Sequence, residues 1–243
     1  MSDTFVLHSS VAFGDVDRDN VLTLQGGFKL LQEAAIAHAN QYDTGTDAMI
    51  TRGESWVLKR EAVAIDRYPR YGERLRVETW SSGIRGSKGY RDFRVYAGDG
   101  DPIVRGSSLW LYISVRARSV VRVPADIAAR FPSRPHDVFC PDLQDLPFDE
   151  PDPKAADVLR VSLRYSDVDA NDHVNNTTYL DLLQTALARL GRPARPRDIR
   201  IKYGRGIPGN ADGVEVRLSP ADDGATRFSI ASGEEVFAQG ACK

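Results

Sequence analysis

Apolar residues recur along the chain with a helical period in two segments. The first segment contains Leu24, Phe28, Leu31 and Ala35, and the second contains Leu180, Leu183, Leu187 and Leu190. Spacings of three and four residues place each set on one face of a helix. Asn175 or Asn176 is expected to cap the N-terminus of the second helix, and Gly191 followed by Pro193 predicts its end.

A period of two residues follows each helix and predicts half-buried antiparallel strands. RLRVETW, from Arg74, and LWLYISV, from Leu109, show this alternation most clearly. Tight turns are indicated at Ala97–Asp101 and Ala221–Gly224. The predicted strands are Trp56–Asp66, Glu73–Ser82, Lys88–Tyr96 and Ile103–Val115 after the first helix, and Asp198–Tyr203, Gly213–Leu218, Thr226–Ala231 and Val236–Ala241 after the second.

The same pattern occurs twice in the chain. FGDVDRDNVLTLQGGFKLLQEAA, from Phe13, aligns without a gap with YSDVDANDHVNNTTYLDLLQTAL, from Tyr165, at an offset of 152 residues. Each copy supplies a helix and several antiparallel strands, an order that predicts an α+β fold with a helix packed on a sheet. Pro132–Lys154 is rich in Pro and Asp and has no periodic apolar pattern. We therefore expect a linker at 132–154 between a domain at 1–131 and a domain at 155–243.

Composition narrows the class of protein. The 243 residues have a hydrophobic fraction of 42% and a formal net charge of -2, which is ordinary for a globular protein and does not indicate a nucleic-acid-binding surface. Cys140 and Cys242 fit neither a metal nor a redox spacing, so we expect two reduced thiols and no metal. The chain shows neither a secretory signal nor a membrane-spanning stretch, and we predict a cytoplasmic protein.

The second copy resembles a known family of enzymes. Its segment Asp169-Ala-Asn171-Asp-His173-Val-Asn175-Asn176-Thr-Thr-Tyr179 is similar to the D-x-N-x-H-V-N-N-x-x-Y motif of acyl-acyl carrier protein thioesterases. In the first copy, LLQEAAIAHA, WVLKREAVAIDRYPRYGERLRVETW and RGSSLWLYISVRARSVVRVP resemble the first half of that family. The resemblance implies a double hotdog, in which two tandem hotdog units each wrap an antiparallel sheet around a long central helix. It also implies an active site in the second copy and an acyl pocket largely in the first.

Thioester hydrolysis needs an activated water and a place for the charge that develops on the carbonyl oxygen. We expect Asp169 to orient the catalytic group or act as a base, Asn171 to hold the carbonyl or the water, and His173 to transfer protons. A backbone N–H near Asn175, at the helix N-terminus, is expected to bind the substrate. Each side chain also has a structural interpretation: a helix cap for Asp169, a turn for Asn171 and a hydrogen-bonded buried ring for His173. The first copy has Asp19 and Val21 where the second has Asn171 and His173, so the second copy is expected to be the competent one.

One acid that the resemblance implies is missing. The family pattern places a Glu on the strand after the second helix, where this chain has Gly206, and single-hotdog relatives carry a helix Glu where this chain has Gln184. Three outcomes stay open: Asp169 and His173 suffice, another acid such as Glu33 takes part, or the protein binds acyl thioesters with little turnover. For Glu33, a solvent-facing helix position is the favoured interpretation.

We therefore predict hydrolysis of acyl-acyl carrier protein thioesters to a free acid and the carrier thiol, in fatty acid biosynthesis. No cofactor is required, because water is the second substrate. An acyl-CoA thioesterase and an inactive acyl-thioester-binding protein are the alternatives. The basic run Ile84–Arg91 is either a contact for the carrier protein or a solvated hairpin. A monomer and a homodimer both fit the sequence.

Overall fold

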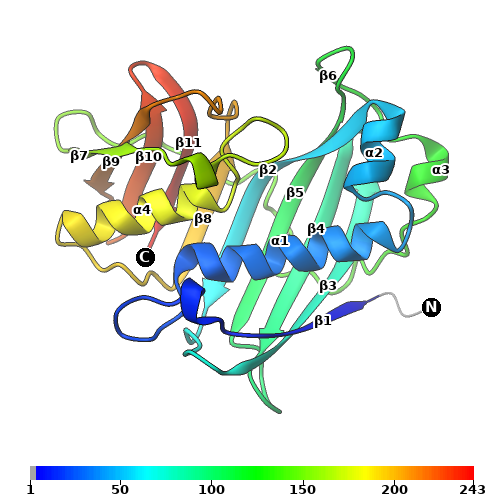
Figure 1. The fold of residues 1–243 in the computed structure, drawn as a ribbon, viewed down its shortest axis with the longest axis horizontal. Helices are drawn as coiled ribbons and strands as arrows, with labels where there is room; N and C mark the ends of the chain where they lie inside the picture. Colours follow the sequence, from blue (N-terminus) through cyan, green and yellow to red (C-terminus); the bar gives the residue numbers. More distant parts are fainter. Residues whose placement is uncertain (1–3) are drawn as a thin grey trace.

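The computed structural model describes residues 4–243, which form one antiparallel sheet with two long helices on one face (Figure 1). The first half supplies β1 (Phe5–Ser10), β2 (Glu54–Ile65), β3 (Arg74–Arg85), β4 (Lys88–Tyr96), β5 (Val104–Ser114) and the short β6 (Ser119–Val120). The second half supplies β7 (Asp157–Ser162), β8 (Asp198–Tyr203), β9 (Gly213–Pro220), β10 (Thr226–Ser232) and β11 (Glu235–Cys242).

The strand order shows that the sequence repeat is also a structural repeat. The first half runs β1-β3-β4-β5-β2 and the second runs β8-β11-β10-β9-β7, so the equivalent strands β2 and β8 meet at the centre. At this seam Arg60 lies opposite Lys202, and Ala64 lies opposite Asp198. Two half-sheets thus pair edge to edge inside one chain, which removes an exposed edge from each. The predicted α+β architecture with repeated units is confirmed.

Each half-sheet carries one long helix, α1 (Leu24–Asn40) or α4 (Thr178–Arg189), and the two helices lie next to each other (Figure 1). Their apolar stripes face the sheet, so Leu31 and Leu183 are almost completely buried. Burying a leucine side chain contributes about 1.5–3 kcal/mol, which makes these stripes the main attachment of each helix. Gly191 follows α4 with a φ of 70°, a left-handed conformation that ends the helix as predicted.

The start of α4 differs from the prediction. Thr177, not Asn175 or Asn176, is the N-cap residue. The side-chain oxygen of Asn175 accepts hydrogen bonds from the N–H and the hydroxyl of Thr177, at 2.9 and 2.8 Å. Asn175 therefore makes a turn before the helix, because a short polar side chain competes with the backbone for its hydrogen-bonding groups. The short helices α2 (Thr46–Arg52) and α3 (Ala125–Ala128) were not predicted, since neither is long enough to show a period.

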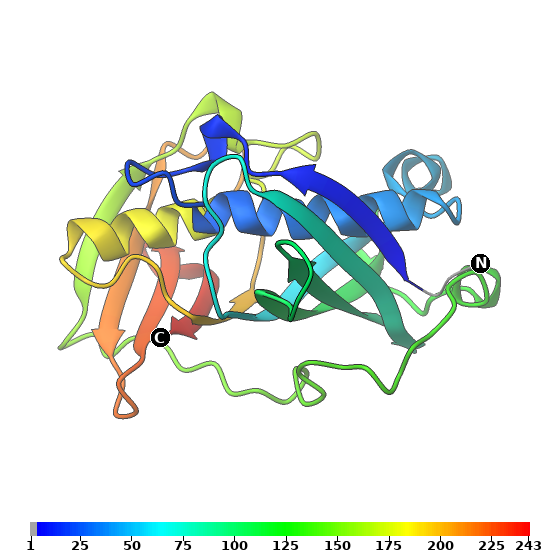
Figure 2. The same cartoon turned by 90° about the horizontal axis from the view of Figure 1, so that it is seen from below.

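The segment between the two halves packs on the face of the sheet opposite the helices (Figure 2). The N–H of Phe139 donates to the carboxylate of Asp92, and the N–H of Cys140 donates to the hydroxyl of Ser107, both at 2.9 Å. Leu143 in the same segment is only 1% exposed. The segment thus provides partners for buried polar groups of β4 and β5, which would otherwise be left without hydrogen bonds.

Candidate active site

The two Asp-Val-Asp loops of the repeat fold in the same way. In the second copy the N–H of Asn171 donates to Oδ1 of Asp169 at 2.8 Å, and the N–H of Asp169 donates to the carbonyl of His173 at 2.8 Å. In the first copy the N–H of Asp19 donates to Oδ1 of Asp17 at 2.9 Å. One carboxylate oxygen of each aspartate therefore maintains a turn. The structural alternative for Asp169, a helix cap, is wrong, because Thr177 is the N-cap residue of α4.

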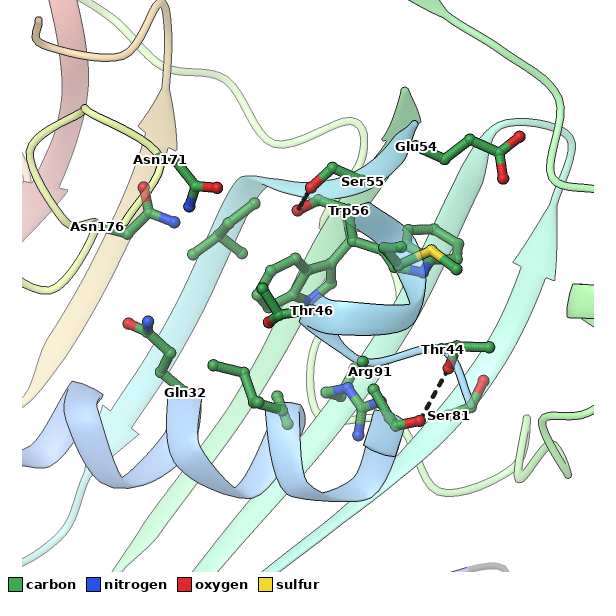
Figure 3. A pocket seen from close by; sticks show the side chains of 18 of the residues that line it. Gln32, Thr44, Thr46, Glu54, Ser55, Trp56, Ser81, Arg91, Asn171 and Asn176 are labelled. Carbon is green, nitrogen blue, oxygen red and sulfur yellow. Dashed lines mark hydrogen bonds between the residues drawn. The ribbon is translucent and has the colours of Figure 1, made fainter. Parts of the chain in front are cut away.

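A cavity of about 350 Å³ lies between the first half-sheet and the helices α1 and α2, and it reaches the loop before α4. Figure 3 shows Asn171, Asn176 and Gln32 at one end of the cavity, with Trp56 between them and Arg91 at the other end. The wall of the cavity is mainly apolar and includes Phe28, Met49, Leu58 and Trp110. An apolar chain with a polar group at one end fits such a site.

The structure separates the predicted site residues. Asp169 and Asn171 line the cavity, whereas His173 does not. His173 is exposed, and its Nδ1 lies 2.8 Å from the carbonyl oxygen of Asn171, to which a ring N–H donates. A buried ring, the structural alternative for His173, is therefore excluded. The ring holds the backbone of Asn171 from outside the cavity.

The N–H groups at the start of α4 differ in availability. The N–H of Asn175, expected to bind the substrate, donates to the carbonyl of Asp167 at 2.8 Å and is therefore not available. The N–H of Asn176, one residue later, has no hydrogen-bond partner within residues 4–243. Asn176 also lines the cavity. Within residues 4–243 the free N–H just before α4 thus belongs to Asn176, because the carbonyl of Asp167 takes the N–H of Asn175 and the side chain of Asn175 takes that of Thr177.

The internal repeat indicates which side chain is related to this N–H. At an offset of 152 residues, Asn176 is equivalent to Leu24, and Gln32 is equivalent to Gln184. The N–H of Leu24 donates to Oε1 of Gln184 at 2.9 Å, and Nε2 of Gln184 donates to the carbonyl of Ala194 at 2.9 Å. Gln32 has no hydrogen-bond partner among the described residues, and it points into the cavity (Figure 3). The two equivalent junctions therefore differ: a glutamine occupies one, and the other is open.

Local contacts explain why neither position 206 nor position 184 carries the acid that the family pattern implies. A Cβ atom at Gly206 would lie 2.6 Å from Cδ2 of His173, so the imidazole ring occupies the space that a side chain at position 206 would need. Gln184 is engaged in the hydrogen bonds that close the other junction. Glu33 is exposed on α1, which confirms its solvent-facing interpretation.

A buried carboxyl group that the sequence did not reveal lies on the cavity wall. Glu61 on β2 is 6% exposed, and its Oε2 accepts a hydrogen bond from the hydroxyl of Tyr203 on β8 at 3.0 Å. A β-bulge between Leu58 and Arg60 turns both Leu58 and Glu61 toward the helices. Burial raises the pKa of Glu61 to about 8, and the hydrogen bond from Tyr203 opposes part of this rise. The signal in the sequence was a glutamate at an apolar position of a predicted strand.

A buried arginine lies at the other end of the cavity (Figure 3). Arg91 on β4 lies with one guanidinium nitrogen 2.8 Å from Nδ1 of His38 and 3.0 Å from the hydroxyl of Thr79. Burial, and then the charge of Arg91, lower the pKa of His38 to about 3, so the neutral ring accepts from the guanidinium. The basic run Ile84–Arg91 is a hairpin between β3 and β4, and Ile84, Gly89, Tyr90 and Arg91 contribute to the cavity wall.

The described part of the chain has neither a metal-binding cluster nor a membrane-spanning helix. Residues 4–243 contain no group of three or more His, Cys, Asp or Glu side chains arranged to hold a metal ion. None of the helices in this range is long and apolar enough to cross a membrane.

The sequence is similar to known proteins in both halves. Residues 2–131 match the family described as acyl-ACP thioesterase N-terminal domain, and residues 151–227 match the acyl-ACP thioesterase C-terminal domain. A palmitoyl-acyl carrier protein thioesterase of Cuphea hookeriana is 29% identical over 70% of this chain and 44% of its own length. A dodecanoyl-[acyl-carrier-protein] hydrolase of Cinnamomum camphora is 31% identical over 70% of this chain and 48% of its own length. The chain thus spans less than half of each of these two relatives, both named as chloroplastic.

Solved structures extend the likeness to the whole described fold. An acyl-ACP thioesterase from Bacteroides thetaiotaomicron superimposes with a TM-score of 0.83 at 22% identity, covering 100% of this chain and 99% of that chain. The 12:0-ACP thioesterase from Umbellularia californica superimposes with a TM-score of 0.83 at 20% identity, covering 100% of this chain and 97% of that chain. Both likenesses confirm the double hotdog fold.

Proposed function

Because the chain belongs to the acyl-ACP thioesterase family, we propose that it hydrolyses acyl thioesters carried by acyl carrier protein, at the cavity before α4. The products are a free acid and the thiol of the carrier. The observation that carries the proposal is the difference between the two equivalent junctions of the repeat. At the junction with the Asp169 loop, the start of a helix, an apolar cavity and a glutamine with no partner in the described part of the chain meet. At the other junction Gln184 fills the corresponding position.

In this proposal the acyl chain lies in the apolar part of the cavity and the thioester carbonyl lies between Gln32 and Asn176. The N–H of Asn176 and the amide of Gln32 then donate to the carbonyl oxygen as it becomes negative, and each such donor contributes a factor of about 10² to 10³ in rate. The dipole of α4 favours the same charge. Neither donor has a competing partner in the described chain, so no internal hydrogen bond has to break before the substrate binds.

We assign the polar loop before α4 to holding the water that attacks the thioester. One oxygen of Asp169 is fixed by the N–H of Asn171, and we assign its other oxygen to binding and orienting the attacking water. Asn171 lines the same end of the cavity and helps to hold this water. His173 is a positioning residue, because its ring N–H donates to the carbonyl of Asn171 from outside the cavity.

Free-thiol release from acyl carrier protein and CoA thioesters of several chain lengths tests the proposal. We expect turnover by the wild type and a loss of about 10² to 10⁴ in kcat for Asp169→Asn. Asn171→Ala should also lower kcat, because Asn171 helps to hold the water. Asp19→Ala is its matched control, since Asp19 is the equivalent residue of the first copy and is exposed. Saturable binding of an acyl thioester without turnover by the wild type would replace the proposal with a binding function.

The same assay separates the two thioester classes. Preference for carrier-protein substrates supports the function proposed above, and equal or higher kcat/KM for CoA substrates supports an acyl-CoA thioesterase. A cytoplasmic location and the choice between monomer and homodimer stay predictions from the sequence. Cell fractionation and analytical ultracentrifugation, respectively, test them.

A further inference from the structure

The proposed hydrolysis needs a group that accepts a proton from water, and the acid implied at position 206 is a glycine in this chain. We propose that Glu61, from the first half of the chain, is that general base, with Tyr203 as its positioning partner. This inference rests on the function proposed above. It assigns the active site to both halves of the chain, with the carboxyl group from β2 and the helix N-terminus and polar loop from the second half.

The seam between β2 and β8 brings Glu61 to the site. Ile201 lies opposite Glu61 in the register of these strands, and Tyr203 follows two residues later on the same face of β8. The hydroxyl of Tyr203 lies 3.0 Å from Oε2 of Glu61 and 3.5 Å from the carbonyl oxygen of Asn176. Glu61 is thus connected through one side chain to the residue whose N–H is free. All three residues line the same cavity.

The contacts of Glu61 differ from those of a structural ion pair. No Lys or Arg lies within salt-bridge distance of its carboxyl group in the described chain, and Tyr203 is its one hydrogen-bond partner there. An unpaired carboxyl that is 6% exposed carries a large desolvation cost, which packing alone does not require. Strained or costly groups of this kind concentrate at functional sites. Its second oxygen, Oε1, has no partner among the described residues and is assigned to the water.

In the proposed reaction Glu61 carries one proton from the water to the leaving sulfur. Ionised Glu61 takes a proton from the water as the water oxygen bonds to the thioester carbon, and the carbonyl π pair moves to the oxygen near Asn176 and Gln32. When this pair returns, the C–S bond breaks and the sulfur leaves with the bonding electrons. The proton on Glu61 passes to that sulfur, which gives the carrier thiol and the carboxylic acid, and Glu61 is ionised again for the next cycle.

Titration of Glu61 predicts the pH dependence of the reaction. Since burial raises its pKa to about 8, the ionised fraction and therefore kcat/KM rise about tenfold between pH 7 and pH 9. Burial and the adjacent carboxyl raise the pKa of Tyr203 well above 10, so its hydroxyl stays protonated and donates. The other ionisable side chains on the cavity wall are Glu54 on β2, Tyr90 and Arg91 on β4, and Asp169 before α4.

The test compares pH profiles of kcat/KM for the wild type, Glu61→Gln, Tyr203→Phe, Asp169→Asn and the control Glu33→Gln. Gln at position 61 still accepts from Tyr203, so the fold is retained, and thermal unfolding checks this. We expect Glu61→Gln to lose a factor of about 10² to 10⁴ and the alkaline rise. Tyr203→Phe should shift the rise to higher pH, because the ionised carboxylate loses a donor. Asp169→Asn should be slower but keep the rise, and Glu33→Gln should match the wild type.

The outcomes distinguish this inference from the function on which it rests. An active wild type together with a Glu61→Gln variant within threefold of its rate, or with an unchanged alkaline rise, overturns the role of Glu61 alone. A rise that disappears in Asp169→Asn and persists in Glu61→Gln assigns the base to Asp169 instead. A wild type that hydrolyses no acyl thioester removes both proposals.

Discussion

Replacing each of the two equivalent glutamines by methionine distinguishes a residue that stabilises the fold from one that contributes to catalysis. Gln184→Met and Gln32→Met each replace an amide with an apolar side chain of similar length at positions related by the offset of 152 residues. The side chain of Gln184 forms hydrogen bonds with the N–H of Leu24 and the carbonyl of Ala194, whereas Gln32 has no hydrogen-bond partner among the described residues. The first change therefore removes two hydrogen bonds from the folded protein, and the second removes none.

The magnitudes follow from these contacts. Each lost hydrogen bond costs about 1 kcal/mol, so Gln184→Met should lower the free energy of unfolding by about 2 kcal/mol. For a chain of this size, 1 kcal/mol corresponds to roughly 2–4 °C in Tm, which predicts a decrease of about 4–8 °C. Gln32→Met should change Tm by less than about 2 °C. If Gln32 donates to the developing oxyanion, kcat of that variant should fall by about 10², while Gln184→Met keeps kcat within about threefold.

Calorimetry and free-thiol release measured on the same three preparations check both halves of this prediction. Equal decreases in Tm for the two variants would refute the difference between the junctions. An unchanged kcat in Gln32→Met would refute the placement of the thioester carbonyl beside it. Gln32→Glu adds a further check, because a carboxylate cannot donate to an oxyanion and should lower kcat as much as methionine does.

Four further changes have definite expected results. Burial raises the pKa of Glu61 from 4.5 to about 8 on folding, so the folded state holds a proton that the unfolded state has already lost between these pH values. The wild type should therefore lose several kcal/mol of its free energy of unfolding as the pH rises from about 4.5 to 8. Urea unfolding at several pH values should show this loss for the wild type but not for Glu61→Gln. Ala39→Phe fills part of the cavity and should lower kcat/KM for long acyl chains by about tenfold relative to short ones. Leu143→Ala should cost about 2–5 kcal/mol in urea unfolding, and the half-buried Leu146→Ala clearly less. His173→Ala should lower kcat by about tenfold or more without changing the alkaline rise of the pH profile, because the ring acts through Asn171.

The periodic patterns of the chain were sufficient for its architecture. Alternation located Lys88–Tyr96 and Asp198–Tyr203 at their observed bounds, and it located the other predicted strands within a few residues. These patterns are local, since each strand or helix must turn its own apolar face to the core. The internal repeat then predicted two equivalent units, and the loss of the imidazole at Val21 indicated that the units differ in function.

The candidate site depended on contacts between segments far apart in the chain. Glu61 and Tyr203 are separated by 142 positions and meet only because β2 pairs with β8. Asp169 and Asn171 face the cavity while His173 lies outside it, although all three are within five residues of one another. Sequence spacing located this loop, but it does not decide which side of a tight turn each side chain occupies.

The sequence by itself determined the two repeated α+β units, the family and the loop that carries the polar residues. The tertiary structure alone decided that, within residues 4–243, Asn176 rather than Asn175 has a free N–H and Gln32 has no hydrogen-bond partner. It also decided that a buried carboxyl group lies across the seam. The physical reason is that secondary structure follows from each segment's own pattern of burial. The availability of a donor or a carboxylate depends on which distant groups already satisfy it.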